Sequence, residues 1–282
     1  MTPIILIGAG RSGTKFLRSI LSASDNVSSI PYDVGYVWRY GNESYHSDEL
    51  KPEHLNDNIR SYIRKTLPSL VRNNGHLSKY FVEKSVPNSL RVKFIHKVYP
   101  DAKFVFLIRD GRAVTESSIR LWKAPSDKKY LVKKLRYFPW RNYRYAFWYI
   151  GNILQGMVNK RGQNIWGPRY DNIEVDSKKL PMEVVCARQW RKCVELAHVD
   201  LLSIPKEQVI QVKYEDFMKS SSELERICRF LKIPDADNVI QKFENTVEIN
   251  NLDKWRENLT GNSLHLVEEE INSTLSKFGY ID

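Results

Sequence analysis

The sequence predicts an α/β fold in which helices cover both faces of a central parallel sheet. Short apolar runs alternate with segments of helical periodicity along the chain, which is the pattern of parallel strands joined by crossover helices. A glycine-rich turn at residues 8–13 follows the first apolar run, as in sheets that bind nucleotides. No apolar run approaches the ~18 residues of a membrane span, and this agrees with a globular α/β protein.

The expected elements follow from periodicity and from proline positions. Apolar runs predict strands over residues 3–8, 27–30, 80–83, 104–108 and 209–212. Helical spacing predicts helices over residues 12–23, 52–73, 88–99, 111–122, 181–203, 220–231, 235–245 and 263–278. Pro68 is expected to interrupt or bend the second of these helices, and Pro100 to end the third. We expect one domain over residues 1–282.

A basic, aromatic-rich insertion is expected at residues 128–170. It holds ten Lys or Arg residues, eleven aromatic residues and no Asp or Glu, within a chain of net charge +11. Such a charge suggests an anionic partner. The insertion could be a cover that binds a substrate, a nucleic-acid face, an anionic membrane surface, or helices whose aromatic side chains simply pack. A rigid loop over a cleft is expected at Trp166–Tyr170, because the segment contains Gly-Pro.

The three cysteines do not indicate a disulfide framework or a metal site. Cys186, Cys193 and Cys228 form no C-x-x-C pair, and an odd, sparse count fits a reducing compartment. Cys186 and Cys193 are seven residues apart on an expected helix, so we expect them to share a buried face. No His/Cys cluster has metal-ligand spacing, and we expect no metal.

The turn after the first strand matches two nucleotide-binding patterns and completes neither. Gly8, Gly10 and Gly13 form the G-x-G-x-x-G of a dinucleotide fold, with Asp33 near the position of the ribose-binding acid. Gly8, Gly13 and Thr14-Lys15 form a P-loop whose Gly-Lys-Thr ending is reversed. Either reading predicts anion binding, because a helix N-terminus offers unpaired N–H groups.

A second anion site is predicted about a hundred residues later. In KFVFLIRDGRAVTESSIRLW, Arg109 lies at the end of an apolar strand, and Ser117 lies two turns into the following helix. Arg and Ser side chains that converge there would bind a phosphate separate from the one at residues 10–15. A ligand with both a 5′- and a 3′-phosphate needs two such sites.

These ordered motifs resemble those of the sulfotransferase superfamily, which uses 3′-phosphoadenosine 5′-phosphosulfate (PAPS). GAGRSGTKFLRSIL is similar to its 5′-phosphosulfate loop, FVFLIRDGRAVTESSIRLW to its 3′-phosphate motif, and FVEKSVPNSLR to its lysine-bearing segment. VIQVKYEDF and NNLDKWRENL resemble its closing elements. The resemblance implies a P-loop-like three-layer sandwich. It is nearer to the glycan and tyrosyl-protein branch and its bacterial relatives than to the cytosolic small-molecule enzymes.

The resemblance also implies roles for individual residues. The predicted donor-binding residues are Gly10, Arg11, Ser12, Gly13, Thr14, Lys15, Arg109, Ser117 and Lys254. Arg11 would lie beside the bridging oxygen and Lys84 would stabilise the leaving group or the sulfuryl oxygens. No metal is required, because these side chains supply positive charge.

The general base is less well defined by the motifs. Small-molecule enzymes of the superfamily have a histidine two residues after the lysine, where this chain has Val86. Asp33 is the first candidate, because the tyrosyl-protein and glycan branches use an acid soon after the second strand. Glu83 is the second and His46 the third.

The resulting expectation is a PAPS-dependent sulfotransferase that releases 3′-phosphoadenosine 5′-phosphate (PAP) and acts on a hydroxyl, of a carbohydrate or another polar acceptor. A P-loop nucleotide kinase and a nucleic-acid-binding protein that uses residues 128–170 are the alternatives. We expect a cytoplasmic enzyme, with a lumenal enzyme that has lost its anchor as the alternative. The oligomeric state stays open.

Overall fold

A five-stranded parallel sheet forms the centre of the molecule. The computed structural model describes residues 1–71, 78–123, 165–248 and 252–281. The strands are β1 (Thr2–Ile7), β2 (Val27–Ser29), β3 (Tyr80–Glu83), β4 (Lys103–Ile108) and β5 (Val209–Lys213). They lie in the order β2-β3-β1-β4-β5, and every neighbouring pair is parallel. The predicted fold class is confirmed.

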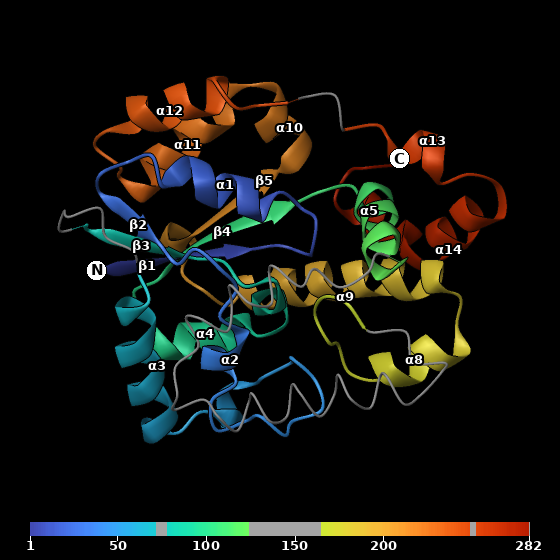
Figure 1. Ribbon diagram of the computed structural model, residues 1–282, viewed down its shortest axis with the longest axis horizontal. Coiled ribbons are helices and arrows are strands. Elements are labelled where there is room, and N and C mark those ends of the chain that lie inside the picture. Colours follow the sequence, from blue (N-terminus) through green and yellow to red (C-terminus); the bar gives the residue numbers. More distant parts are fainter. Residues whose placement is uncertain (72–77, 124–164, 249–251, 282) are drawn as a thin grey trace.

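Helices cover both faces of this sheet, as Figure 1 shows. One face packs on α1 (Thr14–Leu21), α10 (Tyr214–Lys219), α11 (Ser221–Leu231) and α12 (Ala236–Glu244), and the other on α3 (Asp57–Ser69), α4 (Val92–Val98) and α9 (Met182–Leu201). Alternate residues of β1 supply the two cores: Ile4 and Leu6 belong to the first, and Ile5 and Ile7 to the second. A strand buried on both faces reads as a continuous apolar run, which explains why the sequence pattern found β1, β3 and β4.

Two predicted helices are each divided into a 3-10 helix and an α-helix. The segment expected as 52–73 is a 3-10 turn, η1 (Pro52–His54), followed by α3, because the Asn56 side chain caps α3 by accepting a hydrogen bond from Ile59 N at 2.9 Å. Pro68 lies inside the last turn of α3 and does not interrupt it. The segment expected as 88–99 is a 3-10 helix, η2 (Val86–Leu90), then α4, with the extended φ of −150° at Arg91 between them.

The predicted helix at 12–23 also starts later, at Thr14, because Gly13 has a left-handed backbone conformation. Several short helices were not predicted, since they lack enough residues for a periodic pattern: α2 (Gly35–Trp38), α8 (Ile173–Lys179), α10, α13 (Trp255–Asn258) and η4 (Lys206–Gln208). Cys186 and Cys193 are both buried on α9 as expected, and Cys228 is buried on α11.

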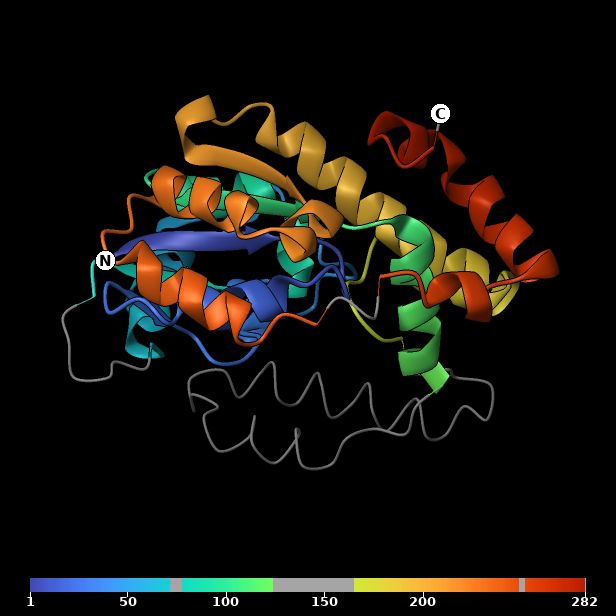
Figure 2. The same ribbon diagram turned by 90° about the horizontal axis from the view of Figure 1, so that it is seen from above.

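The carboxyl ends of the strands define one edge of the sheet, where α/β proteins bind ligands. Helices α5 (Gly111–Lys123), α13 and α14 (Gly261–Lys277) lie beyond this edge (Figure 2). The chain leaves β1 toward β3 and β2 and later crosses to β4 on the other side of β1. The loops after β1 and β4 therefore diverge at the switch point of the sheet. Among the described residues, no helix is long and apolar enough to cross a membrane.

Candidate active site

The loop between β1 and α1 has a backbone suited to anions. Arg11 and Gly13 both have positive φ angles, of 70° and 86°, in the left-handed region that non-glycine residues seldom adopt. Gly13 precedes α1, and no side chain caps that helix start. The first N–H groups of α1 therefore remain available to a negatively charged ligand.

The two predicted phosphate motifs meet at Arg11. Arg109, directly after β4, donates a hydrogen bond from Nη1 to the Arg11 carbonyl oxygen at 3.0 Å. Arg11 in turn donates from Nε to Ser117 Oγ, on α5, at 2.9 Å. The structure thus brings Arg11 together with Arg109 and Ser117, which are about a hundred positions away in the sequence. They meet at the carboxyl edge of the sheet, as the sequence predicted. The Arg11 guanidinium lies toward Ser117, on the side predicted for the 3′-phosphate.

Several cationic groups face the same region. The pKa of Arg11 is lowered, first by burial and then by the neighbouring positive charges of Arg109 and Arg120. The Arg109 guanidinium lies over the ring of Tyr214, 4.5 Å from its centroid. Guanidinium groups that repel one another are stabilised by an anion placed between them, so this cluster fits a polyanionic ligand.

Lys84 and Asp33 form an ion pair at the ends of adjacent strands. Lys84 Nζ donates to the two carboxylate oxygens of Asp33, at 3.1 and 3.4 Å. Lys84 follows β3 and is almost buried, whereas the Asp33 side chain, beyond β2, is 32% exposed. A basic and an acidic group that touch at this edge can stabilise developing negative charge and accept a proton.

The other two candidates for the general base have different surroundings. Glu83 is fully buried and accepts hydrogen bonds from Ser85 Oγ, at 2.6 Å, and from the Asn88 amide. Burial raises the pKa of Glu83, although the Ser85 hydrogen bond and Arg91 oppose the rise. His46 is exposed, with Nε2 2.8 Å from Asp171 Oδ1. Of the three candidates, only Asp33 contacts Lys84 in the described residues.

The remaining predicted site residues differ in exposure. Ser12 in the loop and Thr14 at the start of α1 are buried, and Lys15 is exposed. The Ser12 hydroxyl has no hydrogen-bond partner within the described part of the chain. Lys254 is exposed and directly precedes α13. Within the described ranges it has no recorded contact with the loop, and its role stays a prediction.

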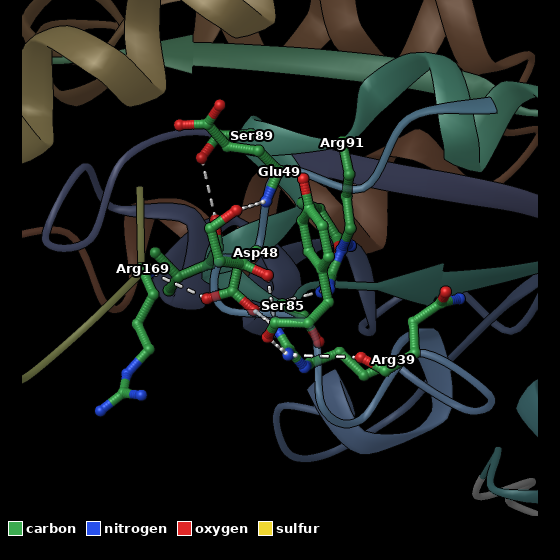
Figure 3. Close-up of polar contacts among 12 residues, drawn as sticks. Arg39, Asp48, Glu49, Ser85, Ser89, Arg91 and Arg169 are labelled. Atoms are coloured by element: carbon green, nitrogen blue, oxygen red, sulfur yellow. Dashed lines mark hydrogen bonds and ion pairs between the residues drawn. The ribbon is translucent and has the colours of Figure 1, made fainter. Parts of the chain in front are cut away.

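A buried charge cluster joins two distant segments near the site (Figure 3). Asp48 accepts hydrogen bonds from Arg39 Nη1 at 3.1 Å and from Arg169 N at 2.8 Å, and its own N–H donates to the Arg169 carbonyl at 2.7 Å. Arg91, fully buried, lies 3.9 Å from the same carboxylate. The segment after α2 is therefore tied to residues 166–171, the described end of the basic aromatic insertion. Residues 128–164 of the insertion lie outside the described part.

Sequence reasoning missed three residues that shape the site. Tyr214 packs on Gly13, where an added Cβ would lie 2.3 Å from its ring. Asp48 links two segments, and Gln189, on α9, donates hydrogen bonds to the carbonyls of Trp166 and Pro168. Only Tyr214 carried a usable signal, because it lies two residues after the strand expected at 209–212. Asp48 and Gln189 act across long sequence separations that no local pattern reports.

Comparison with known proteins identifies the family of this chain. The model of the Sulfotransferase family matches residues 3–145, about half of the chain. The chain belongs to the sulfotransferase family. The match contains both the β1–α1 loop and the β4–α5 segment, and thus the predicted site except Lys254.

Related proteins include protein-tyrosine sulfotransferases. The chain is 28% identical over 126 residues to a putative protein-tyrosine sulfotransferase of Caenorhabditis briggsae, covering 41% of this chain and 42% of that protein. It is 30% identical over 128 residues to protein-tyrosine sulfotransferase 1 of Danio rerio, covering 42% and 35%. The chain thus matches less than half the length of each of these relatives.

Solved sulfotransferase structures share the fold. A sulfotransferase from Mycobacterium avium superposes with a TM-score of 0.52 at 13% identity, covering 98% of this chain and 76% of that one. The sulfotransferase domain from the curacin biosynthetic pathway gives a TM-score of 0.50 at 14% identity, covering 96% and 98%. At these identities the likeness establishes the fold alone.

The buried acid Glu83 leads to a prediction about pH. Burial raises the pKa of Glu83 in the folded protein, so the folded state binds its proton more tightly than the unfolded chain does. The free energy of unfolding contributed by this group then decreases as pH rises above the unfolded value of about 4.3. We expect the wild type to lose stability relative to Glu83→Gln as the pH rises above about 4. Urea unfolding at a series of pH values measures this, and parallel pH profiles for the two proteins would contradict it.

The Asp48 cluster predicts an asymmetry between buried and exposed ion pairs. Asp48→Asn leaves the buried guanidinium groups of Arg39 and Arg91 without their carboxylate, at an expected cost of about 3 kcal/mol. Asp171→Asn removes the exposed partner of His46, which ties the same two segments, and should cost less than about 1 kcal/mol. Chemical denaturation of both variants tests this, and equal losses would rule out a structural role for the buried cluster.

Proposed function

We propose that this protein transfers a sulfuryl group from PAPS to an acceptor hydroxyl. The observation that carries the proposal is the pair of hydrogen bonds that joins Arg109, Arg11 and Ser117. These bonds connect the β1–α1 loop with the strand–helix segment after β4, at the switch point of a parallel sheet. Two adjacent anion-binding segments suit a nucleotide with phosphates at both its 5′ and 3′ positions.

Each group of residues has one task in this proposal. Lys15, Gly13 and the N-terminus of α1 hold the 5′-phosphate, and Arg109 with Ser117 holds the 3′-phosphate. Lys84 neutralises the charge that grows on the leaving oxygen and the sulfuryl oxygens, and Arg11 joins it when its side chain turns from Ser117 toward the donor. Lys254 is a further donor contact. The donor supplies the activated sulfuryl group, and positive side chains give the electrostatic stabilisation.

Asp33 is the proposed proton acceptor. The acceptor oxygen forms a bond to sulfur, the bond between sulfur and the 5′-phosphate oxygen breaks, and the acceptor proton passes to the Asp33 carboxylate. The products are PAP and the sulfated acceptor. The contact between Asp33 and Lys84 supports this assignment, because it places the base beside the cation that stabilises the transferred group.

The acceptor is proposed as a class only. The hydroxyl belongs to a carbohydrate or another polar acceptor, and the net charge of +11 favours an acceptor that also carries negative charge. The names of the relatives favour the phenolic hydroxyl of tyrosine. A single domain over residues 1–282, a substrate-binding role for residues 128–170 and a cytoplasmic location remain predictions.

The donor assignment predicts a specific ligand preference. PAP should raise the melting temperature more than AMP, NAD or ATP with magnesium at equal concentration, because only PAP carries a 3′-phosphate. PAP at about 100 times its Kd should raise the free energy of unfolding by about 2.7 kcal/mol. Arg109→Ala should abolish the preference of PAP over AMP. Arg226→Ala, which removes an arginine from an exposed pair with Glu223 on α11, is the matched control.

Other outcomes of this thermal shift assay would point elsewhere. Equal stabilisation by PAP and AMP would refute the proposed function, and a preference for ATP with magnesium would favour the nucleotide kinase. Salt-sensitive binding of DNA or RNA without a PAP response would favour the nucleic-acid-binding protein.

The proton acceptor is tested by comparing its three candidates. Asp33→Asn should lower sulfuryl transfer from PAPS to tyrosine peptides and oligosaccharides by about a hundredfold or more, with unchanged affinity for PAP. Glu83→Gln and His46→Gln should each retain a transfer rate within about an order of magnitude of the wild type. The Glu83 side chain is fully buried, and the His46 side chain lies in an exposed pair with Asp171. A larger loss in either of those variants than in Asp33→Asn would reassign the base.

A further inference from the structure

Trp166 lies directly over the donor-binding loop. A Cβ added to Gly10 would lie 3.1 and 3.2 Å from two carbons of the Trp166 ring and 3.6 Å from Val86 Cγ1. The indole ring and the Val86 side chain therefore adjoin the same loop position. Both side chains are half-buried, so each leaves apolar surface open.

The backbone that carries Trp166 is held by side chains from two other segments. Gln189, 4% exposed, donates hydrogen bonds from Nε2 to the carbonyl oxygens of Trp166 at 2.9 Å and Pro168 at 2.8 Å. Gly167 has a φ of 90°, and an added Cβ would lie 3.1 Å from the Gln189 amide. Asp48 pairs with the backbone of Arg169 on the other side. The indole is thus held in place by a preorganised support.

The apolar surface lies beside the reacting groups. Val86 follows Lys84 by two residues, and Lys84 contacts Asp33. Phosphate and sulfuryl oxygens gain nothing from an indole face or a valine methyl, and cationic groups already serve them. A ring with an apolar face, however, packs well on indole. This surface therefore suits the acceptor.

We propose that Trp166 and Val86 form the wall of the acceptor site, and that Gln189 positions Trp166. This rests on the proposed sulfuryl transfer. The acceptor group is a ring that packs one face on the indole and directs a hydroxyl at its edge toward Lys84 and Asp33. A phenol and a sugar ring share this chemistry, and Trp166 selects for the ring by stacking.

The test measures acceptor-side binding separately from donor binding. Titration calorimetry with the PAP-saturated protein gives the affinity for 4-nitrophenol and, in a second series, for methyl β-glucopyranoside. For whichever of these two compounds binds the wild type, Trp166→Ala should raise the Kd by about five- to tenfold. Trp166→Phe should raise it by no more than about threefold. Affinity for PAP should not change in either variant.

Two further variants complete the design. Gln189→Met removes both hydrogen bonds to the Trp166 segment while keeping the side-chain length. It should lower the affinity for the same ring compound without changing the affinity for PAP. Phe230→Ala removes a half-buried aromatic on α11, beneath Lys103 at the opposite edge of the sheet, and should leave ring binding unchanged.

The proposal fails if Trp166→Ala binds the ring as the wild type does, if the PAP-bound wild type binds neither ring, or if Trp166→Ala loses affinity for PAP itself. The last result would make Trp166 part of the donor site. These failures are distinct from failure of the proposed function, which shows as a missing preference for PAP over AMP in the wild type.

Discussion

The site depends on how closely neighbouring backbone and side chains pack against three loop glycines. An added Cβ would lie 2.7 Å from the Leu107 carbonyl at Gly8, against the Trp166 ring at Gly10, and 2.3 Å from the Tyr214 ring at Gly13. These contacts bring the end of β1 against β4, the 166–170 segment and the start of α10. The bond between Arg109 and the Arg11 carbonyl is possible because the loops are this close. The glycines thus serve packing as well as anion binding.

Around this loop the sheet order determines which charges meet. β3 and β4 are the two neighbours of β1, so Lys84 and Arg109 approach the loop from opposite sides. β2 adjoins β3, which places Asp33 against Lys84. Because parallel strands end at one edge, Lys84 and Arg109 lie on the two sides of the β1–α1 loop, which carries Arg11 itself. At this edge Asp33 is the acid that pairs with Lys84 among the described residues.

Much of the fold and part of the candidate site could be predicted from sequence. All five strands were found: β1, β3 and β4 are continuous apolar runs because they are buried on both faces, and β5 alternates buried with exposed residues. Short helices such as α2 and α13 were missed because they contain about one turn and have no periodic pattern. Arg109 and Ser117 could be named because they lie in one strand–turn–helix segment. Asp48 and Gln189 could not, because their partners are more than twenty residues away in the sequence.

What the sequence determined by itself is local: apolar runs that must be buried as strands, glycines where a side chain would clash, and the cations that follow the strands. The tertiary structure alone decided which of these groups touch. The pairing of Asp33 with Lys84, the bond from Arg11 to Ser117 and the position of Trp166 over Gly10 all depend on strand order and on segments far apart in the chain. Residue type and spacing specify the geometry within an element, whereas contacts between elements arise only when the buried faces pack together.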